Sequence, residues 1–219
     1  MAENGPETGT GDGPECFGLT VRMHLIFHAG GQMYSIKAFT GKKSERAVPV
    51  LTMKMKIFDR MNNAYLLTGG NLGNREQNLA SARELIGQHC GTIIGASSLY
   101  ETAAWGKTDQ PDFLNQALHI STYLNAKQLI RRILKTEKLM GRVREEKYGP
   151  RIIDIDLLLF NNEILNYPFL KIPHPELPNR RFALLPLAEI APGLVHPVMN
   201  KKIAQLLEDC KDQLFVKKI

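Results

Sequence analysis

Two aspartates inside an apolar run carry the strongest chemical signal in this 219-residue chain. Asp154 and Asp156 are separated by one residue in the run 152–160. In a strand, residues i and i+2 point to the same face, so the two carboxylates lie side by side while Ile153 and Ile155 face the other way. Adjacent, partly buried carboxylates raise each other's pKa unless a cation neutralises them. The pair therefore predicts a hard divalent metal ion with oxygen ligands, Mg²⁺.

Basic residues immediately precede the two aspartates in the sequence: Arg142, Arg144, Lys147 and Arg151. Guanidinium groups match phosphate oxygens bidentately, so this segment can bring cation, metal and polyphosphate together. Phosphoryl transfer needs such positioning and charge neutralisation more than it needs a covalent nucleophile. The alternative is that the aspartates only form structural salt bridges with the arginines. Burying unpaired charge in an apolar run is expensive, which favours a functional site.

Composition indicates a soluble globular protein, with 43% hydrophobic and 23% charged residues and a mean hydropathy of −0.20. No apolar run approaches the roughly 20 residues of a membrane span, and the N-terminus lacks the features of a secretory signal. We therefore expect a cytoplasmic protein with no membrane partner, and we expect a monomer. The net charge of +6 suits a pocket for polyanionic small molecules as well as it suits nucleic acid.

Three cysteines at wide spacing, Cys16, Cys90 and Cys210, predict reduced thiols with no disulfide framework or zinc site.

The first 62 residues are predicted to be an extension. Residues 1–15 contain almost no apolar side chains and should be disordered. Two alternating runs between Leu19 and Phe39 are compatible with a hairpin. Alternatively, residues 1 to about 60 reflect an upstream choice of start codon.

From Ala64 onward, strand and helix periods alternate in the order strand, helix, strand, strand, helix, strand. The strands are expected at 64–68, 92–101, 113–124 and 152–160. Asn74 and Asn125 are expected to cap the two helices, which end near Gly91 and at Gly141. The second helix should bury a stripe formed by Leu129, Ile130, Ile133, Leu134 and Met140.

Two further features complete the pattern. Gly69–Gly73 matches no phosphate-loop motif, so a tight turn is predicted there and ATP would bind without a P-loop. The proline-rich C-terminal segment should wrap the core without building a second one. The economical architecture is one α/β domain with a βαββαβ centre.

The segment Lys147–Leu158, together with Pro173–Pro175, Arg180, Phe182 and Pro186–Pro192, resembles the 6-hydroxymethyl-7,8-dihydropterin pyrophosphokinase family of folate biosynthesis. The similarity runs from about Ala64 to Pro197. It implies an α/β (α+β) fold: a ferredoxin-like βαββαβ core with an antiparallel sheet and additional C-terminal helices and loops, within a domain at 63–219. It also implies transfer of the diphosphate of ATP to the hydroxymethyl oxygen of the dihydropterin, leaving AMP.

The resemblance assigns roles by position. Asp154 and Asp156 would hold two Mg²⁺ ions, and Arg142 and Arg151 would neutralise the transferring group. The residues assigned to ATP are Glu137, Arg142, Arg144, Arg151, His174 and Arg180. The residues assigned to the pterin are Thr102, Ala104, Trp105, Phe113, Asn115, Tyr148 and Phe182, with the two phenylalanines sandwiching the ring.

The chain departs from the family pattern at Gly70 in place of serine, at Ala103 and Ala104 in place of prolines, and at Leu134 in place of glutamine. We expect altered affinity with retained chemistry.

Two other functions are compatible with parts of this pattern. A nucleic-acid-binding module of the RRM type has the same strand and helix order, but its aromatic strand motif is absent and no nucleic-acid partner is expected. A two-metal phosphodiesterase would use the same aspartates. Production of AMP only in the presence of pterin would exclude it.

Overall fold

The computed structural model describes residues 22–23, 38–39, 61–104, 109–142 and 149–219. The chain divides into two compact units, Met1–Met53 and Lys54–Ile219. In the first unit, β1 (Arg22–Met23) pairs antiparallel with β2 (Ala38–Phe39), which agrees with the expected hairpin. The predicted disorder of residues 1–15 falls outside the described residues, and the predicted boundary at residue 63 stays a prediction.

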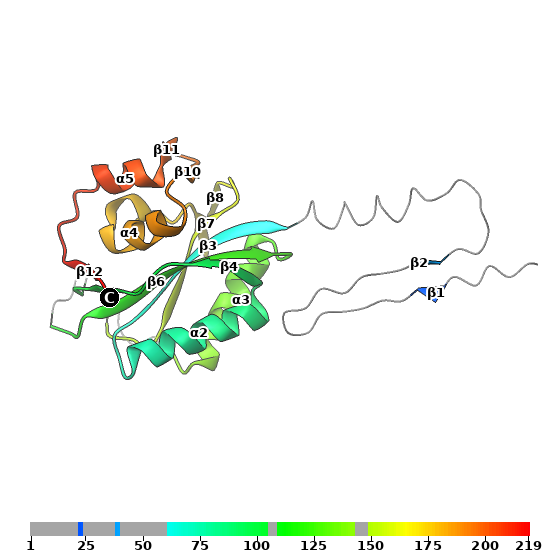
Figure 1. Cartoon of the computed structure of the whole chain (residues 1–219), viewed down its shortest axis with the longest axis horizontal. Coiled ribbons are helices and arrows are strands. Elements are labelled where there is room, and N and C mark those ends of the chain that lie inside the picture. Colours follow the sequence, from blue (N-terminus) through cyan, green and yellow to red (C-terminus); the bar gives the residue numbers. More distant parts are fainter. Residues whose placement is uncertain (1–21, 24–37, 40–60, 105–108, 143–148) are drawn as a thin grey trace, which may run out of the picture. The chain divides into compact units, whose positions relative to one another are not determined.

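An antiparallel sheet forms the centre of the second unit (Figure 1). Its strands are β3 (Asn62–Gly70), β4 (Thr92–Ala96), β5 (Tyr100–Thr102), β6 (Phe113–Thr122), β7 (Asp154–Phe160) and β12 (Val216–Lys218). The order is β12-β5-β6-β3-β7, and β4 also pairs with β6. This is the predicted ferredoxin-like arrangement. The single strand expected at 92–101 is two strands, β4 and β5, which both pair with β6.

Helices α2 (Arg75–His89) and α3 (Ala126–Leu139) lie on one face of the sheet (Figure 1). The predicted caps are confirmed. The Asn74 side chain accepts a hydrogen bond from the backbone N–H of Gln77, and Asn125 forms a capping box with Gln128. Gly141, just after α3, has a φ of +81°, which glycine adopts without steric cost.

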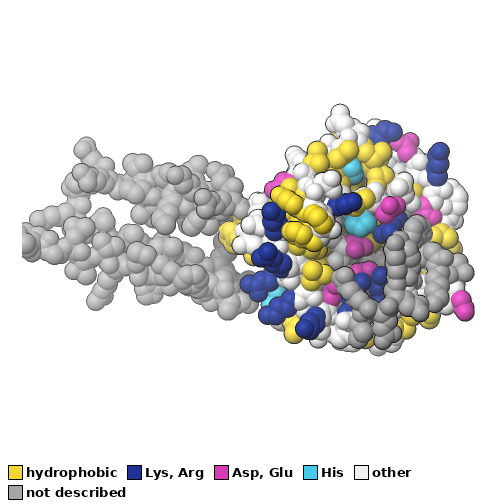
Figure 2. Space-filling model, turned by 180° about the vertical axis from the view of Figure 1, so that it is seen from behind, with side chains coloured by type: hydrophobic (Ala, Val, Ile, Leu, Met, Phe, Trp, Pro, Cys, Tyr) yellow, Lys and Arg dark blue, Asp and Glu magenta, His cyan; other side chains and the backbone are white. Residues whose placement is uncertain are grey.

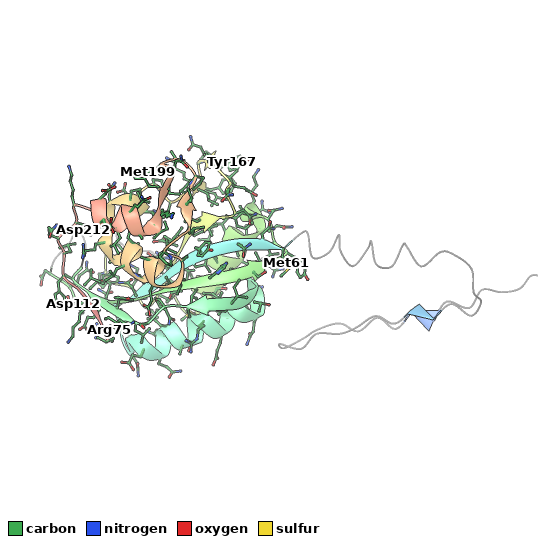
Figure 3. The ribbon with its side chains drawn as sticks, turned by 45° about the horizontal axis from the view of Figure 1, so that its top comes forward. Met61, Arg75, Asp112, Tyr167, Met199 and Asp212 are labelled. Atoms are coloured by element: carbon green, nitrogen blue, oxygen red, sulfur yellow. The ribbon has the colours of Figure 1, made fainter. Side chains whose placement is uncertain are left out.

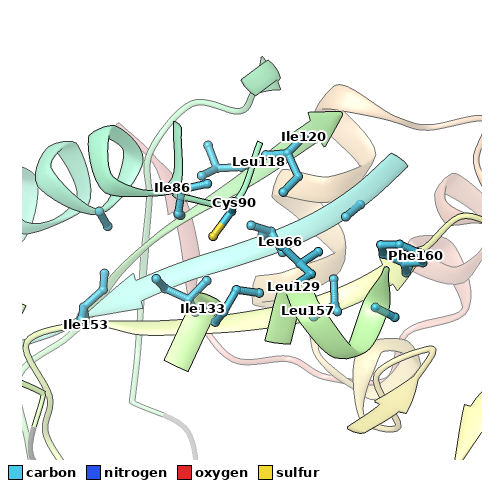
Figure 4. Close-up of a cluster of buried hydrophobic side chains, with 14 of the residues drawn as sticks. Leu66, Ile86, Cys90, Leu118, Ile120, Leu129, Ile133, Ile153, Leu157 and Phe160 are labelled. Atoms are coloured by element: carbon cyan, nitrogen blue, oxygen red, sulfur yellow. The ribbon is translucent and has the colours of Figure 1, made fainter. Parts of the chain in front are cut away.

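The first hydrophobic cluster lies between these helices and the sheet (Figure 4). Leu129 and Ile133 of α3 are fully buried, and Ile130 of α3 and Met140, which follows the helix, are partly buried against the cluster. The prediction that Leu134 is buried is wrong, because its side chain is 43% exposed. One residue corresponds to about 100° around a helix, so Leu134 turns away from the face that Ile133 presents.

The C-terminal segment covers the opposite face with α4 (Arg181–Ile190) and α5 (Ile203–Asp209) (Figure 1). A second hydrophobic cluster forms there, with Leu67 and Ala117 from the sheet and Leu184, Leu187 and Ile203 from the helices. The expectation that this segment builds no second core is therefore wrong. An antiparallel sheet with both faces apolar needs cover on both sides, and this segment supplies the second cover.

Short elements lie between β7 and α4: the hairpin β8 (Leu165–Tyr167) with β9 (Leu170–Ile172) and the 3₁₀ helix η1 (Leu177–Asn179). The hairpin β10 (Val195–His196) with β11 (Lys201–Lys202) connects α4 to α5. Across the described part of the chain, no helix combines the length and the apolar character needed to cross a membrane.

Candidate active site

The register of the central strands builds a row of polar side chains on one face of the sheet. Gly69 of β3 lies opposite Asn115 of β6 on one side and opposite Asp154 of β7 on the other. One pleat further, Leu67 lies opposite Asp156. Side chains at paired positions share a face, so both aspartates point to the same side as Asn115. The predicted separation of the aspartates from Ile155, which is in the first hydrophobic cluster, is confirmed.

This row forms the floor of a cavity of about 230 Å³. The cavity is lined by Leu67, Gly69, Thr102, Ala103, Phe113, Asn115, Arg151, Asp154, Asp156, His174, Arg180 and Phe182. Figure 2 shows acidic, basic and histidine side chains gathered on one face of the molecule. Residues more than 100 positions apart in the sequence therefore meet in one hollow.

Asp154 forms ion pairs with two arginines. Its Oδ1 lies 2.5 Å from Nη1 of Arg142, and its Oδ2 lies 2.8 Å from Nη1 of Arg151. Arg142 also forms an ion pair with Glu137, a buried residue of α3. The Oε1 atom of Glu137 accepts a hydrogen bond of 2.9 Å from the backbone N–H of Ile155. Helix α3 is thereby connected to β7 at the position between the two aspartates.

The alternative of structural salt bridges with the arginines is therefore correct for Asp154. It does not hold for Asp156 among the residues that the structure describes. Among the described residues, no ion pair reaches Asp156. Burial, followed by the charge of Asp154, raises the pKa of Asp156 to about 7, and Arg180 and Arg151 only partly oppose this. Burial likewise raises the pKa of Glu137. The cavity therefore contains more negative charge than its arginines stabilise.

These carboxylates fit a divalent cation. A bound cation between Asp154 and Asp156 would stabilise the ionised form of Asp156, and oxygen-only donors suit Mg²⁺. Within the described ranges, no group of three or more His, Cys, Asp or Glu side chains is arranged to hold a metal ion. Mg²⁺ needs only one or two protein carboxylates, because water and phosphate oxygens complete its octahedron.

The other half of the cavity is aromatic and amide-lined. Phe113 and Phe182 each have an arginine near the ring: the Arg151 guanidinium carbon lies 5.3 Å from the Phe113 ring centre, and that of Arg180 lies 5.7 Å from the Phe182 ring centre. Both distances fall within the range of cation–π contacts. The buried amide Nδ2 of Asn115 donates a 2.8 Å hydrogen bond to Oγ1 of Thr102.

His174 lines the cavity as a neutral group. Burial, and next the charge of Arg180, lower the pKa of His174 to about 4. Its Nδ1 accepts a hydrogen bond from the backbone N–H of Glu176. With Nδ1 acting as an acceptor, the ring proton is on Nε2, which can donate to an anionic ligand.

Nine of the predicted site residues line the cavity: Thr102, Phe113, Asn115, Arg151, Asp154, Asp156, His174, Arg180 and Phe182. Glu137 and Arg142 lie behind Asp154 in the ion-pair chain. Ala104 is buried but is not a lining residue. Trp105, Arg144 and Tyr148 lie outside the described residues. The cavity is also lined by Leu67, Gly69 and Ala103, which were not predicted as site residues. Only the strand register brings Leu67 and Gly69 beside the aspartates.

The site combines an acidic pair, arginines beside it and an aromatic-lined hollow on a ferredoxin-like sheet. This combination is typical of an enzyme that transfers phosphoryl groups. Residues 65–192 match the family 7,8-dihydro-6-hydroxymethylpterin-pyrophosphokinase (HPPK). The chain belongs to this family. The resemblance inferred from residues 147–192 is thus confirmed.

Individual relatives agree with this assignment. The chain is 39% identical over 145 residues to the 2-amino-4-hydroxy-6-hydroxymethyldihydropteridine pyrophosphokinase of Aquifex aeolicus, covering 66% of this chain and 90% of the relative. It is 46% identical over 132 residues to the enzyme of that name from Bacillus subtilis, covering 59% of this chain and 79% of the relative.

Solved structures share the fold. The chain superposes on the crystal structure of Plasmodium falciparum HPPK-DHPS wild type with STZ-DHP with a TM-score of 0.55 and 20% identity. The match covers 68% of this chain and 43% of that chain, so this protein spans less than half of the Plasmodium protein.

Proposed function

We propose that this protein transfers the diphosphate of ATP to the hydroxymethyl oxygen of 6-hydroxymethyl-7,8-dihydropterin, giving AMP and the pterin diphosphate, a step of folate biosynthesis. The observation that carries the proposal is one cavity with two chemically different halves. One half holds the carboxylates of β7 and two arginines, and the other holds two phenylalanines and a buried amide. A charged polyphosphate and a flat polar ring are the two ligands that such halves accept.

On the phosphate side, Asp154 and Asp156 would hold two Mg²⁺ ions. Bound Mg²⁺ supplies neutralisation of the charge on the phosphate oxygens and orients them for in-line displacement. Arg151 and Arg142 supply positive charge from the protein itself, and both guanidinium groups already form ion pairs with Asp154. The further residues that we assign to the nucleotide are Glu137, Arg144, His174 and Arg180.

On the pterin side, Phe113 and Phe182 would hold the ring between them. Such aromatic contacts contribute about 0.5–1.5 kcal/mol beyond the burial of area. Asn115 would read the polar edge of the ring, assisted by groups at Thr102 and Ala104. We also assign Trp105 and Tyr148 to this side, where closure over the substrates would exclude water.

The test is to mix the protein with MgATP, with and without 6-hydroxymethyl-7,8-dihydropterin, and to identify the nucleotide product by chromatography. We expect AMP only when pterin is present. AMP without pterin would indicate a hydrolase such as the two-metal phosphodiesterase, ADP would indicate a simple kinase, and no turnover in a folded sample would contradict the proposal.

We further propose that the protein acts as a cytoplasmic monomer without a nucleic-acid or membrane partner. Light scattering coupled to size-exclusion chromatography measures the mass directly, and a mass of twice 24.6 kDa would contradict the monomer.

A further inference from the structure

Asn71 is a buried polar residue that follows directly on the last residue of β3 and is only 3% exposed. Its Oδ1 accepts a 2.8 Å hydrogen bond from the backbone N–H of Arg151. Its Nδ2 donates to the backbone oxygen of Pro111 at 3.0 Å and to Oε1 of Gln110 at 3.2 Å. The backbone N–H of Asn71 also donates to the oxygen of Arg151 at 2.9 Å. One side chain thus holds two segments that are about 40 residues apart in the sequence.

Those two segments lead into opposite halves of the cavity. Pro111 precedes Phe113, whose ring lies in the aromatic half, by two residues. Arg151 is itself in the phosphate half and pairs with Asp154. Asn71 does not line the cavity, and its amide atoms are taken up by these backbone and side-chain partners. Any effect of Asn71 on the reaction must therefore act through the residues it holds.

A second contact fixes the pterin-side segment beside the same turn. Arg75, at the start of α2, donates to the backbone oxygen of Asp112 at 2.8 Å and to Oε1 of Glu101 at 2.8 Å. Figure 3 labels Arg75 and Asp112, which lie near each other. Glu101 and Asp112 are the neighbours of Thr102 and Phe113 in the sequence. The turn between β3 and α2 is therefore the common anchor. Its backbone reaches the oxygen of Arg151 through the N–H groups of Asn71 and Leu72, and the side chain of Asn71 accepts from the backbone N–H of Arg151.

We propose that Asn71 is a positioning residue that fixes Arg151 relative to Phe113, so that the phosphate half and the ring half of the site keep one relative geometry. This inference rests on the proposed function. In-line displacement requires the attacking oxygen and the phosphorus to be held close and aligned, and a misplacement of about 1 Å can cost about 10²-fold in rate. A primary amide suits the task, because it offers an acceptor to Arg151 and a donor to Pro111 at once.

The test compares Asn71→Asp and Asn71→Ala with Asn78→Ala as the matched control. Asn78 lies in the same part of the chain, and its Nδ2 donates to the backbone oxygen of Leu72 at 2.9 Å, outside the cavity. The aspartate keeps the shape and the acceptor for Arg151, but it cannot donate to Pro111. The alanine loses both hydrogen bonds.

The measured quantities are the single-turnover rate of AMP formation, KM for each substrate, and the Kd of a non-hydrolysable MgATP analogue by calorimetry. We expect both Asn71 variants to lower the single-turnover rate by about 10- to 100-fold, while KM and Kd change by less than about threefold. Asn78→Ala should stay within about twofold of the wild type in all of them. This split separates misalignment from weaker binding.

Thermal unfolding of each variant distinguishes positioning from stability. If Asn71→Asp lowers the Tm but keeps the wild-type single-turnover rate, Asn71 is only structural and the inference is overturned. The inference is also overturned if KM and Kd increase while the single-turnover rate stays at the wild-type value. If Asn71→Ala does not fold, the isosteric Asn71→Asp decides. Absence of pterin-dependent AMP in the wild type is a different result, because it refutes the proposed function itself.

Discussion

At the scale of single residues, the phosphate half of the site is built around a carboxylate whose ionised form the protein alone does not favour. The pKa of Asp156 is raised from 3.8 to about 7, first by burial and then by Asp154. A raised folded-state pKa means that the contribution to stability is present at low pH and is lost as pH rises from about 4 to about 7. Mg²⁺ binding requires the ionised form, so its affinity should increase over the same interval.

Asp156→Asn tests this charge balance. Removing a buried negative charge should leave the Tm at pH 8 without divalent cations at or above that of the wild type. Added Mg²⁺ should raise the Tm of the wild type but not that of the variant. Turnover should fall by at least about 10²-fold, because the charge that holds the metal is lost. Differential scanning fluorimetry with and without Mg²⁺ measures the first two effects, and a fully active variant would refute the assignment.

Gly69 lies beside Asn115 in the half of the cavity that we assign to the pterin. A Cβ atom at this position would lie 2.2 Å from Oδ1 of Asn115, too close for any real contact. Gly69→Ala should therefore displace the Asn115 side chain from its hydrogen bond with Thr102 and increase KM for the pterin by about 10-fold or more. The affinity for MgATP should change little. An equal increase in KM for the pterin and for MgATP would mean that the whole sheet has shifted.

At the scale of elements, Glu189 joins helix α4 to the edge of the sheet. Its carboxylate accepts hydrogen bonds from the Tyr100 hydroxyl at 2.7 Å and the Ser98 hydroxyl at 2.8 Å, and from Nζ of Lys218 at 3.0 Å. Burial alone would raise the pKa of Glu189, but these hydrogen bonds outweigh it and lower the pKa to about 2. Strand β5 ends at Thr102, which lines the cavity. The hydrogen bonds of Glu189 thereby fix this strand to α4, a helix of the C-terminal layer.

The pH dependence of stability follows from the sign of this shift. A lowered carboxyl pKa contributes stability that is complete above about 4.5 and is lost as pH falls toward about 2. Glu189→Gln should destabilise the protein by about 1–3 kcal/mol at pH 7. The difference between wild type and variant should shrink as pH falls from about 4.5 to about 2. Urea unfolding at several pH values measures it, and a constant difference would contradict the network.

At the scale of the whole molecule, the cavity and both hydrophobic clusters belong to the unit Lys54–Ile219. We expect a variant that lacks residues 1–60 to keep kcat and KM within about twofold of the full chain, because no lining residue is removed. Steady-state kinetics of both proteins tests this. A variant that does not fold, or whose kcat/KM drops by more than about 10-fold, would show that the extension contributes to the enzyme.

Local patterns in the sequence determined the elements and the chemistry of the site. Asn74 and Asn125 marked the helix starts because capping depends on side chains within three residues. The i, i+2 spacing of Asp154 and Asp156 placed both carboxylates on one face because strand geometry is local. The phosphate-transfer character could thus be predicted before the fold, whereas Thr102, Phe113, Asn115 and Phe182 were predicted only through the resemblance to the family.

Only the tertiary structure decided how these pieces meet. The pairing of Gly69 with Asn115 and Asp154 depends on strand register, which no local spacing specifies. The second hydrophobic cluster was not predicted, because short proline-rich helices show only a weak periodicity of apolar residues along the sequence. Together these helices nevertheless cover a whole face of the sheet. The joining of the two halves of the site by Asn71 was equally hidden. Its partners are distant in sequence, and long-range hydrogen bonds are fixed by packing alone.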